Sequence, residues 1–122
     1  MQIPILKQGF FLIVSIQAIV SDGDLESLEK TLASQVGDYR SKGVIIDITT
    51  LDVMDSFSTR TLRSIASTLK LRGAETIIVG IQPDVAFAMI QLGLNLDDVK
   101  TALNLEDGLN MLNHLFKEGL NG

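Results

Sequence analysis

The sequence contains no cysteine, and its only histidine is His114. Without cysteine there can be no disulfide, no thiolate nucleophile and no cysteine-based zinc site, and the cytoplasm becomes the default address. A single histidine cannot form a histidine-rich metal site, and it leaves only one possible base for a Ser-His-Asp triad. Neither glycine-rich nucleotide motif, G-x-x-x-x-G-K-[ST] or G-x-G-x-x-G, occurs. The sequence therefore predicts no catalytic residue, no metal and no cofactor.

Charge is also scarce. Charged residues make up 20% of the chain and hydrophobic residues 46%, with a mean hydropathy of +0.31, so we expect another subunit or partner to cover part of the surface. The net charge of −5 and the pI near 4.6 make nucleic acid and anionic membranes poor partners. No run approaches the roughly eighteen apolar residues of a membrane span, and the N-terminus lacks the basic region of a signal peptide.

The hydrophobic pattern alternates between strands and helices after an initial hairpin. The length of 122 residues suits one domain, and no linker divides residues 1–122. Gln8-Gly9 separates the first two strands by a hairpin-length gap, and Pro4 suits an edge strand because it cannot donate to a ladder. Strands are predicted at 3–7, 10–16, 44–48, 76–79 and 99–102, and helices at 22–43, 56–72, 83–93 and 106–117. The predicted fold is α/β, with an antiparallel N-terminal hairpin, right-handed parallel units and four helices.

The segment from Val44 to Arg60 organises the chain. Val44 to Ile48 is β-branched and almost wholly apolar, which is typical of a central strand covered on both faces. Ser56 precedes a run with helical spacing and is predicted to be the N-cap of that helix. A helix start carries unpaired N–H groups and partial positive charge, so the same hydroxyl could also carry a phosphoryl group. Both roles remain open at this point.

Three carboxylates lie near the same turn. Asp47, Asp52 and Asp55 could form an acidic pocket at the carboxyl end of the central strand, suited to Mg²⁺ or an aspartyl phosphate. Alternatively, Asp52 and Asp55 are common turn residues, and Asp47 could bond loop amides.

The run from Asp47 to Phe57, DITTLDVMDSF, resembles the signature loop of STAS domains, the family of anti-sigma factor antagonists. In that family a hydrophobic strand ending in Asp leads to an Asp-Ser pair at a helix start. Two stretches depart from the family pattern. Phe57-Ser58-Thr59 stands where Gly-Leu-Gly is usual, and Ala18-Ile19-Val20-Ser21 stands where Gly-Glu-Leu-Asp is usual. With these departures, and with Ile3 to Lys7 and Gly80 to Pro83, the chain is similar to the small scaffold members of bacterial stressosomes.

The resemblance implies a non-enzymatic cytoplasmic regulator without a cofactor. Such scaffolds assemble with RsbR-type STAS paralogues into a large particle that sequesters a serine switch kinase. Phosphorylation releases the kinase, and a dedicated serine phosphatase resets the scaffold. Carried onto this chain, the phosphoacceptor is Ser56, with Ser58 as the alternative, and Asp47, Asp52, Asp55 and Thr59 surround it. Self-association is expected, whereas binding to nucleic acid or to a membrane is not.

Two other functions remain as alternatives. A receiver-like protein would phosphorylate an aspartate, which needs clustered carboxylates with a metal and usually a lysine at the carboxyl end of the last strand, whereas Lys100 lies within a weak strand. A small-ligand STAS module would instead show a shift in melting temperature with nucleotides.

Overall fold

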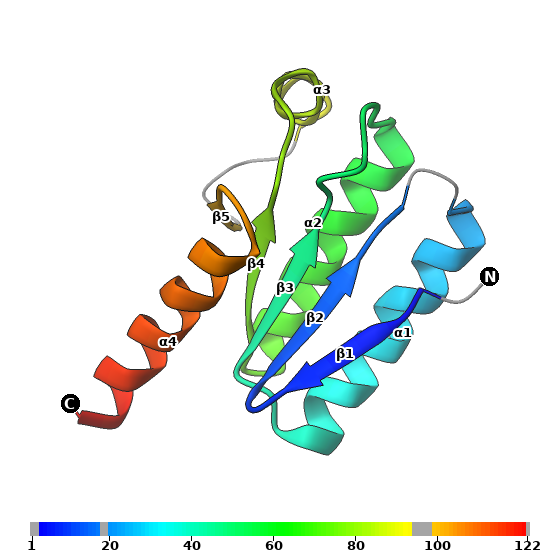
Figure 1. Ribbon diagram of the computed structural model, residues 1–122. Helices are drawn as coiled ribbons and strands as arrows, with labels where there is room; N and C mark the ends of the chain where they lie inside the picture. The colour runs from blue at the N-terminus through cyan, green and yellow to red at the C-terminus, as the bar shows by residue number, and fades with distance from the viewer. Residues whose placement is uncertain (1–2, 18–19, 94–98, 122) are drawn as a thin grey trace.

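The computed structural model describes residues 3–17, 20–93 and 99–121, with side chains described as far as residue 116. A two-stranded hairpin comes first, and strands and helices then alternate (Figure 1). The elements are β1 (Ile5–Gln8), β2 (Phe11–Ser15), α1 (Asp22–Tyr39), β3 (Gly43–Asp47), α2 (Ser56–Leu71), β4 (Glu75–Val79), α3 (Pro83–Gln91), β5 (Lys100–Ala102) and α4 (Leu105–Asn121).

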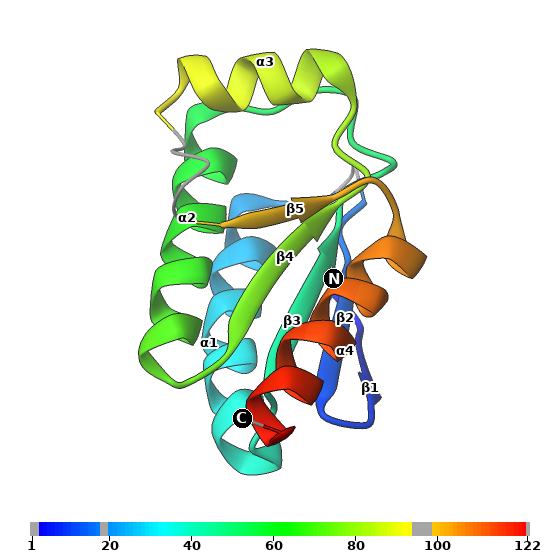
Figure 2. The ribbon, with the colours of Figure 1, turned by 90° about the vertical axis from the view of Figure 1, so that its left-hand side faces the viewer.

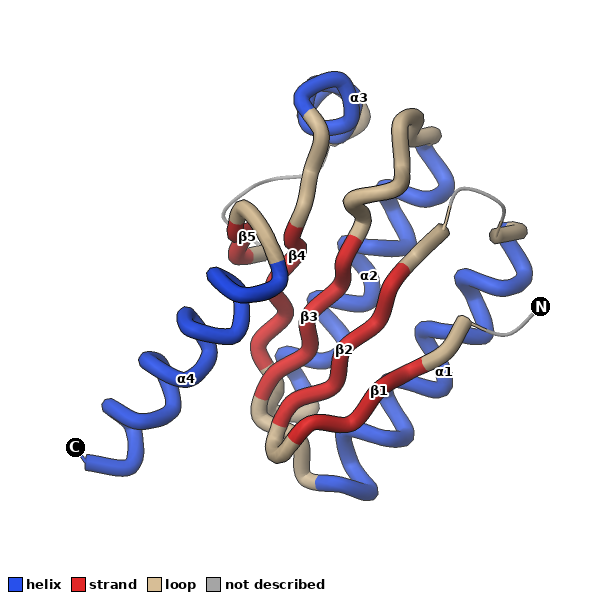
Figure 3. Tube along the Cα trace, in the orientation of Figure 1, coloured by secondary structure: helices blue, strands red, loops and turns tan. Residues whose placement is uncertain are grey.

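The five strands form one mixed sheet in the order β1-β2-β3-β4-β5 (Figure 3). β1 and β2 are antiparallel, and each later pair is parallel. Gly9 makes the hairpin turn with a φ of +60°, and β1, which follows Pro4, is an edge strand. The predicted α/β fold with four helices, an antiparallel hairpin and otherwise parallel strands is confirmed.

The sheet separates two hydrophobic clusters. Helices α1 and α2 cover one face, where Leu32, Ile46 and Ile65 are completely buried. Helix α4 lies across β3, β4 and β5 on the opposite face, over a smaller cluster that includes Ile45 and Leu112 (Figure 2). Both faces of β3 are therefore buried, as the apolar run from Val44 predicted.

The end of α1 differs from the prediction that Gly43 stops it. The helix ends at Tyr39, and Arg40 takes the left-handed conformation with a φ of +52°. Gly43 instead begins β3, where a Cβ would lie 2.6 Å from Leu112 of α4. Its missing side chain allows the last helix to approach the sheet closely. No helix within the described residues is long and apolar enough to span a membrane.

Candidate functional site

The carboxyl end of β3 leads into a loop that polar side chains hold in place. Asp47, the last residue of the strand, accepts two hydrogen bonds through Oδ1, from the Thr49 amide at 2.9 Å and from the Thr49 hydroxyl at 2.5 Å. Gln82, just before α3, donates its side-chain amide to the Thr49 carbonyl at 2.7 Å. The Thr50 hydroxyl lies 3.3 Å from the carbonyl of Ile16. The loop is thus tied to the segments that follow β2 and β4.

The start of α2 corrects the prediction that Ser56 is its N-cap. Asp55 occupies that position with extended backbone, and its Oδ1 accepts the amide of Ser58 at 2.7 Å. A carboxylate is a stronger acceptor than a hydroxyl, so Asp55 satisfies the unpaired N–H and Ser56 becomes the first helical residue. Hydrogen bonding by the amide and then the hydroxyl of Ser58 lowers the pKa of Asp55 below its ordinary value of 3.8, with a smaller contribution from the charge of Arg60.

Three hydroxyl residues in the first turn of α2 lie in different environments. Ser56 is exposed, and none of the described residues hydrogen-bonds to its hydroxyl. Ser58 is half-buried, and its amide is committed to the Asp55 cap. Thr59 is only 1% exposed and donates its hydroxyl to the Asp55 carbonyl at 2.9 Å. The geometry therefore leaves Ser56 as the most accessible of the three.

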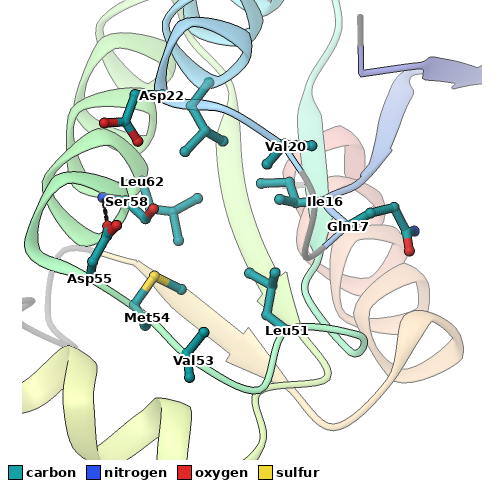
Figure 4. A pocket seen from close by; sticks show the side chains of 11 residues that line it. Ile16, Gln17, Val20, Asp22, Leu51, Val53, Met54, Asp55, Ser58 and Leu62 are labelled. Carbon is teal, nitrogen blue, oxygen red and sulfur yellow. Dashed lines mark hydrogen bonds between the residues drawn. The ribbon is translucent and has the colours of Figure 1, made fainter. Parts of the chain in front are cut away.

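A pocket of about 220 Å³ adjoins this helix start. Figure 4 shows Ser58 and Leu62 of α2 on one side and Ile16 and Val20 on the other, with Met54 and Leu51 of the β3–α2 loop below. The bond between Asp55 and Ser58 closes one corner of the pocket. Most of its walls are aliphatic, so the half-buried Ser58 faces a largely apolar hollow, and Ser56 is not part of the lining.

The structure does not bring Asp47, Asp52 and Asp55 together as a metal-binding group. Asp47 is bonded to Thr49, Asp55 caps α2, and Asp52 is exposed in the loop. In the part of the chain that is described, no three acidic, histidine or cysteine side chains gather closely enough to hold a metal. The geometry gives the receiver-like alternative no support. The family departure at Ala18 and Ile19 lies outside the described residues, whereas Ser21 caps α1 and accepts the Asp24 amide at 3.1 Å.

The cap gives a prediction for stability. Asp55→Ala should lower the free energy of unfolding by about 0.5–2 kcal/mol at pH 7, whereas Asp55→Asn keeps a cap oxygen and should cost less. Because folding lowers the pKa of Asp55, its contribution is present above the ordinary value of 3.8 and is lost as pH falls through the folded-state pKa. Urea unfolding at pH 7 and pH 3 measures both effects. Equal stability of the Ala variant and the parent at pH 7 would contradict the cap.

Sequence reasoning missed the residues that hold the loop in place. Thr49 and Thr50 lie in the signature run and Gln82 lies in the segment from Gly80 to Pro83, but neither pattern shows that their partners are about thirty residues away in the chain. Gly80, the first residue after β4, has a φ of +75°. A Cβ there would lie 3.1 Å from the Cα of Thr49. Only the position of Gly80, directly after a buried strand, could have hinted at such a contact.

Two of the solved structures similar to this chain come from stressosome proteins. A serine-to-glutamate variant of RsbS from Moorella thermoacetica is 34% identical and superposes with a TM-score of 0.87, covering 96% of this chain and 99% of that chain. A chain from a solved structure of the stressosome is 37% identical, with a TM-score of 0.83, over 92% of this chain and 97% of that one.

Among curated proteins, RsbT co-antagonist protein RsbRA of Bacillus subtilis is 28% identical over 99 residues, or 79% of this chain. The match spans only 36% of RsbRA, so this chain corresponds to about a third of that protein. The family model for the STAS domain matches residues 2–108, which is most of the chain. The chain therefore belongs to the STAS domain family.

Proposed function

We propose that the protein is a phosphorylatable scaffold of a stressosome, which binds a serine switch kinase and releases it when Ser56 is phosphorylated. The similarity to RsbS and to the stressosome chain, each over more than nine-tenths of both chains, supports a stressosome or anti-sigma antagonist role. In this role the protein is cytoplasmic and has no enzymatic activity of its own. Its partners are RsbR-type paralogues, further copies of itself, the kinase and a resetting serine phosphatase.

The observation that carries the proposal is the exposed hydroxyl of Ser56 at the first residue of α2. A kinase can reach it without unfolding the chain. Ser58 is half-buried, and its phosphorylation would remove the hydrogen bond from its hydroxyl to the Asp55 carboxylate. Asp47 and Thr59 act in this proposal by fixing the loop and the first helical turn, and Asp55 by capping the helix, while Asp52 adds negative charge to the loop.

A phosphate at this position would be tolerated by its own subunit. It carries a charge of about −1.5 to −2, which the helix dipole and the free N–H groups of the first turn partly offset. A partner arranged for a neutral hydroxyl has no such compensation, and an unpaired charge in its contact costs about 2–5 kcal/mol. Phosphorylation therefore weakens the complex rather than the fold.

Incubation with ATP and a switch kinase tests the proposal. Because the relative RsbRA is named as a co-antagonist of RsbT, we take RsbT of Bacillus subtilis, and its counterpart from the genome that encodes this chain, as the candidate switch kinases. We expect one added phosphate, located on Ser56 by mass spectrometry, and a large particle when the paralogue is present. Phosphate on Ser58 alone would move the site, and absence of both phosphate and particle would overturn the proposed function.

A further inference from the structure

One exposed face of α2 carries basic residues at helical spacing. Ser56, Arg60, Arg63, Ser67 and Lys70 follow one another at intervals of four, three, four and three residues, which places them along one side of the helix. All five are exposed, whereas Leu62, Ile65 and Leu69 on the other side are buried in the core. We call these five residues the basic face of α2. In Figure 2 the helix forms the left edge of the molecule.

The sign of this face is opposite to that of the whole protein. The chain has 15 acidic and 10 basic residues, yet the sixteen residues of α2 include no aspartate or glutamate. Two carboxylates of other segments lie beside it: Asp55 caps the helix and interacts with the charge of Arg60, and Glu29 of α1 accepts the hydroxyl of Ser64. Arg63 also donates to the carbonyl of Gly93 at 3.3 Å, a contact that leaves its charge unneutralised.

We infer that the basic face of α2 is the docking surface for the kinase, and that it pairs with an acidic surface of that protein. The inference rests on the proposed function and adds to it the chemistry of the contact. A local positive patch on a protein of net charge −5 selects for a negative partner surface by charge complementarity. The patch begins at Ser56, so a kinase held on it has its substrate hydroxyl within the same contact.

The position of Ser56 at one end of the basic face also provides an electrostatic mechanism for release of the kinase. Ser56 and Arg60 are four residues apart, and side chains at that spacing are neighbours on a helix. A phosphate on Ser56 therefore adds negative charge at one end of the basic face and pairs with Arg60, which leaves less positive charge for the partner. Arg63 and Lys70 lie farther along the helix and contribute to docking of the unphosphorylated complex.

Charge reversal tests the inference. The double variant Arg63→Glu/Lys70→Glu leaves Ser56, Arg60 and the buried side of α2 intact. Its Kd for the unphosphorylated complex with the switch kinase, measured by calorimetry in low salt, should rise by about tenfold or more. Lys30→Glu/Lys42→Glu, at two exposed positions outside the basic face, changes the net charge by the same amount, is the matched control and should leave the Kd nearly unchanged. Circular dichroism and melting temperature show that each variant is folded.

The outcomes separate this inference from the proposed function. If the parent chain binds neither RsbT nor the counterpart kinase, the proposed function itself fails. If the parent binds but Arg63→Glu/Lys70→Glu loses no more affinity than Lys30→Glu/Lys42→Glu, the docking surface is wrong. If the double variant binds more weakly than the parent at low salt, and this difference in affinity disappears at high salt, the docking surface is supported. If the basic face binds a labelled RNA or DNA duplex while kinase affinity is unaffected by the double variant, the acidic protein partner is overturned.

Discussion

Ser56→Ala is expected to assemble normally and to hold the kinase even after incubation with ATP. The substitution removes one exposed hydroxyl that none of the described residues uses as a hydrogen-bond partner, so fold and particle should be unaffected. Without an acceptor there is no phosphate and no added charge in the contact. Sedimentation of the particle with bound kinase, before and after ATP, measures retention.

Ser56→Glu is the complement of that experiment. A permanent negative charge should weaken kinase binding by roughly thirty-fold to several-thousand-fold, which corresponds to about 2–5 kcal/mol in the contact. The melting temperature should change little because the start of a helix favours negative charge. Ser58→Ala provides the matched control and should release the kinase as the parent does. Normal release by Ser56→Ala, together with retention by Ser58→Ala, would reassign the acceptor to Ser58.

Gly80→Ala is expected to produce the largest loss of stability among single substitutions in the loops. Gly80 has a φ of +75°, and a Cβ there would meet Thr49 Oγ1 at 2.0 Å and the Thr49 Cα at 3.1 Å. Left-handed backbone costs alanine about 1–2 kcal/mol, and overpacking typically costs a further 1–3 kcal/mol or so. Urea unfolding should therefore show a loss of about 2–5 kcal/mol.

Gly73→Ala separates the two costs. Gly73 has a φ of +91°, but no atom lies within 4 Å of the position its Cβ would take. It should show the backbone cost alone, about 1–2 kcal/mol. Equal losses at the two glycines would mean that the contact between Gly80 and Thr49 is unimportant.

The same pair of variants should differ in phosphorylation. Because Thr49 donates two hydrogen bonds to Asp47, Gly80→Ala should also slow phosphorylation of Ser56, whereas Gly73→Ala should not.

Local patterns were sufficient to predict most of the elements of the fold. The apolar β-branched run at Val44 gave the central strand, Gln8-Gly9 gave the hairpin, and Pro83 marked the first residue of a helix. The signature from Asp47 to Phe57 indicated the family that the comparisons show. These features depend only on residues that are close together in the chain, so they can be predicted from a single sequence.

Competition between neighbouring groups was harder to predict. Asp55 and Ser56 are both good N-cap residues, and propensity alone did not separate them. The backbone places the Asp55 carboxylate against the Ser58 amide, which moves Ser56 into the helix and exposes its hydroxyl. The accessibility of the candidate phosphoacceptor follows from this shift of one residue.

The sequence by itself determined the order of the elements, the buried faces of the central strand and the hydroxyl-bearing helix start, because these follow from periodicity and local chemistry. Only the tertiary structure decided which side chains hold the loop, why Gly80 must lack a side chain, and that the basic residues of α2 share one exposed face. Those properties arise between segments about thirty residues apart, or from which side of a helix the core covers. The folded chain fixes them, because contacts across that separation leave no local signal in the sequence.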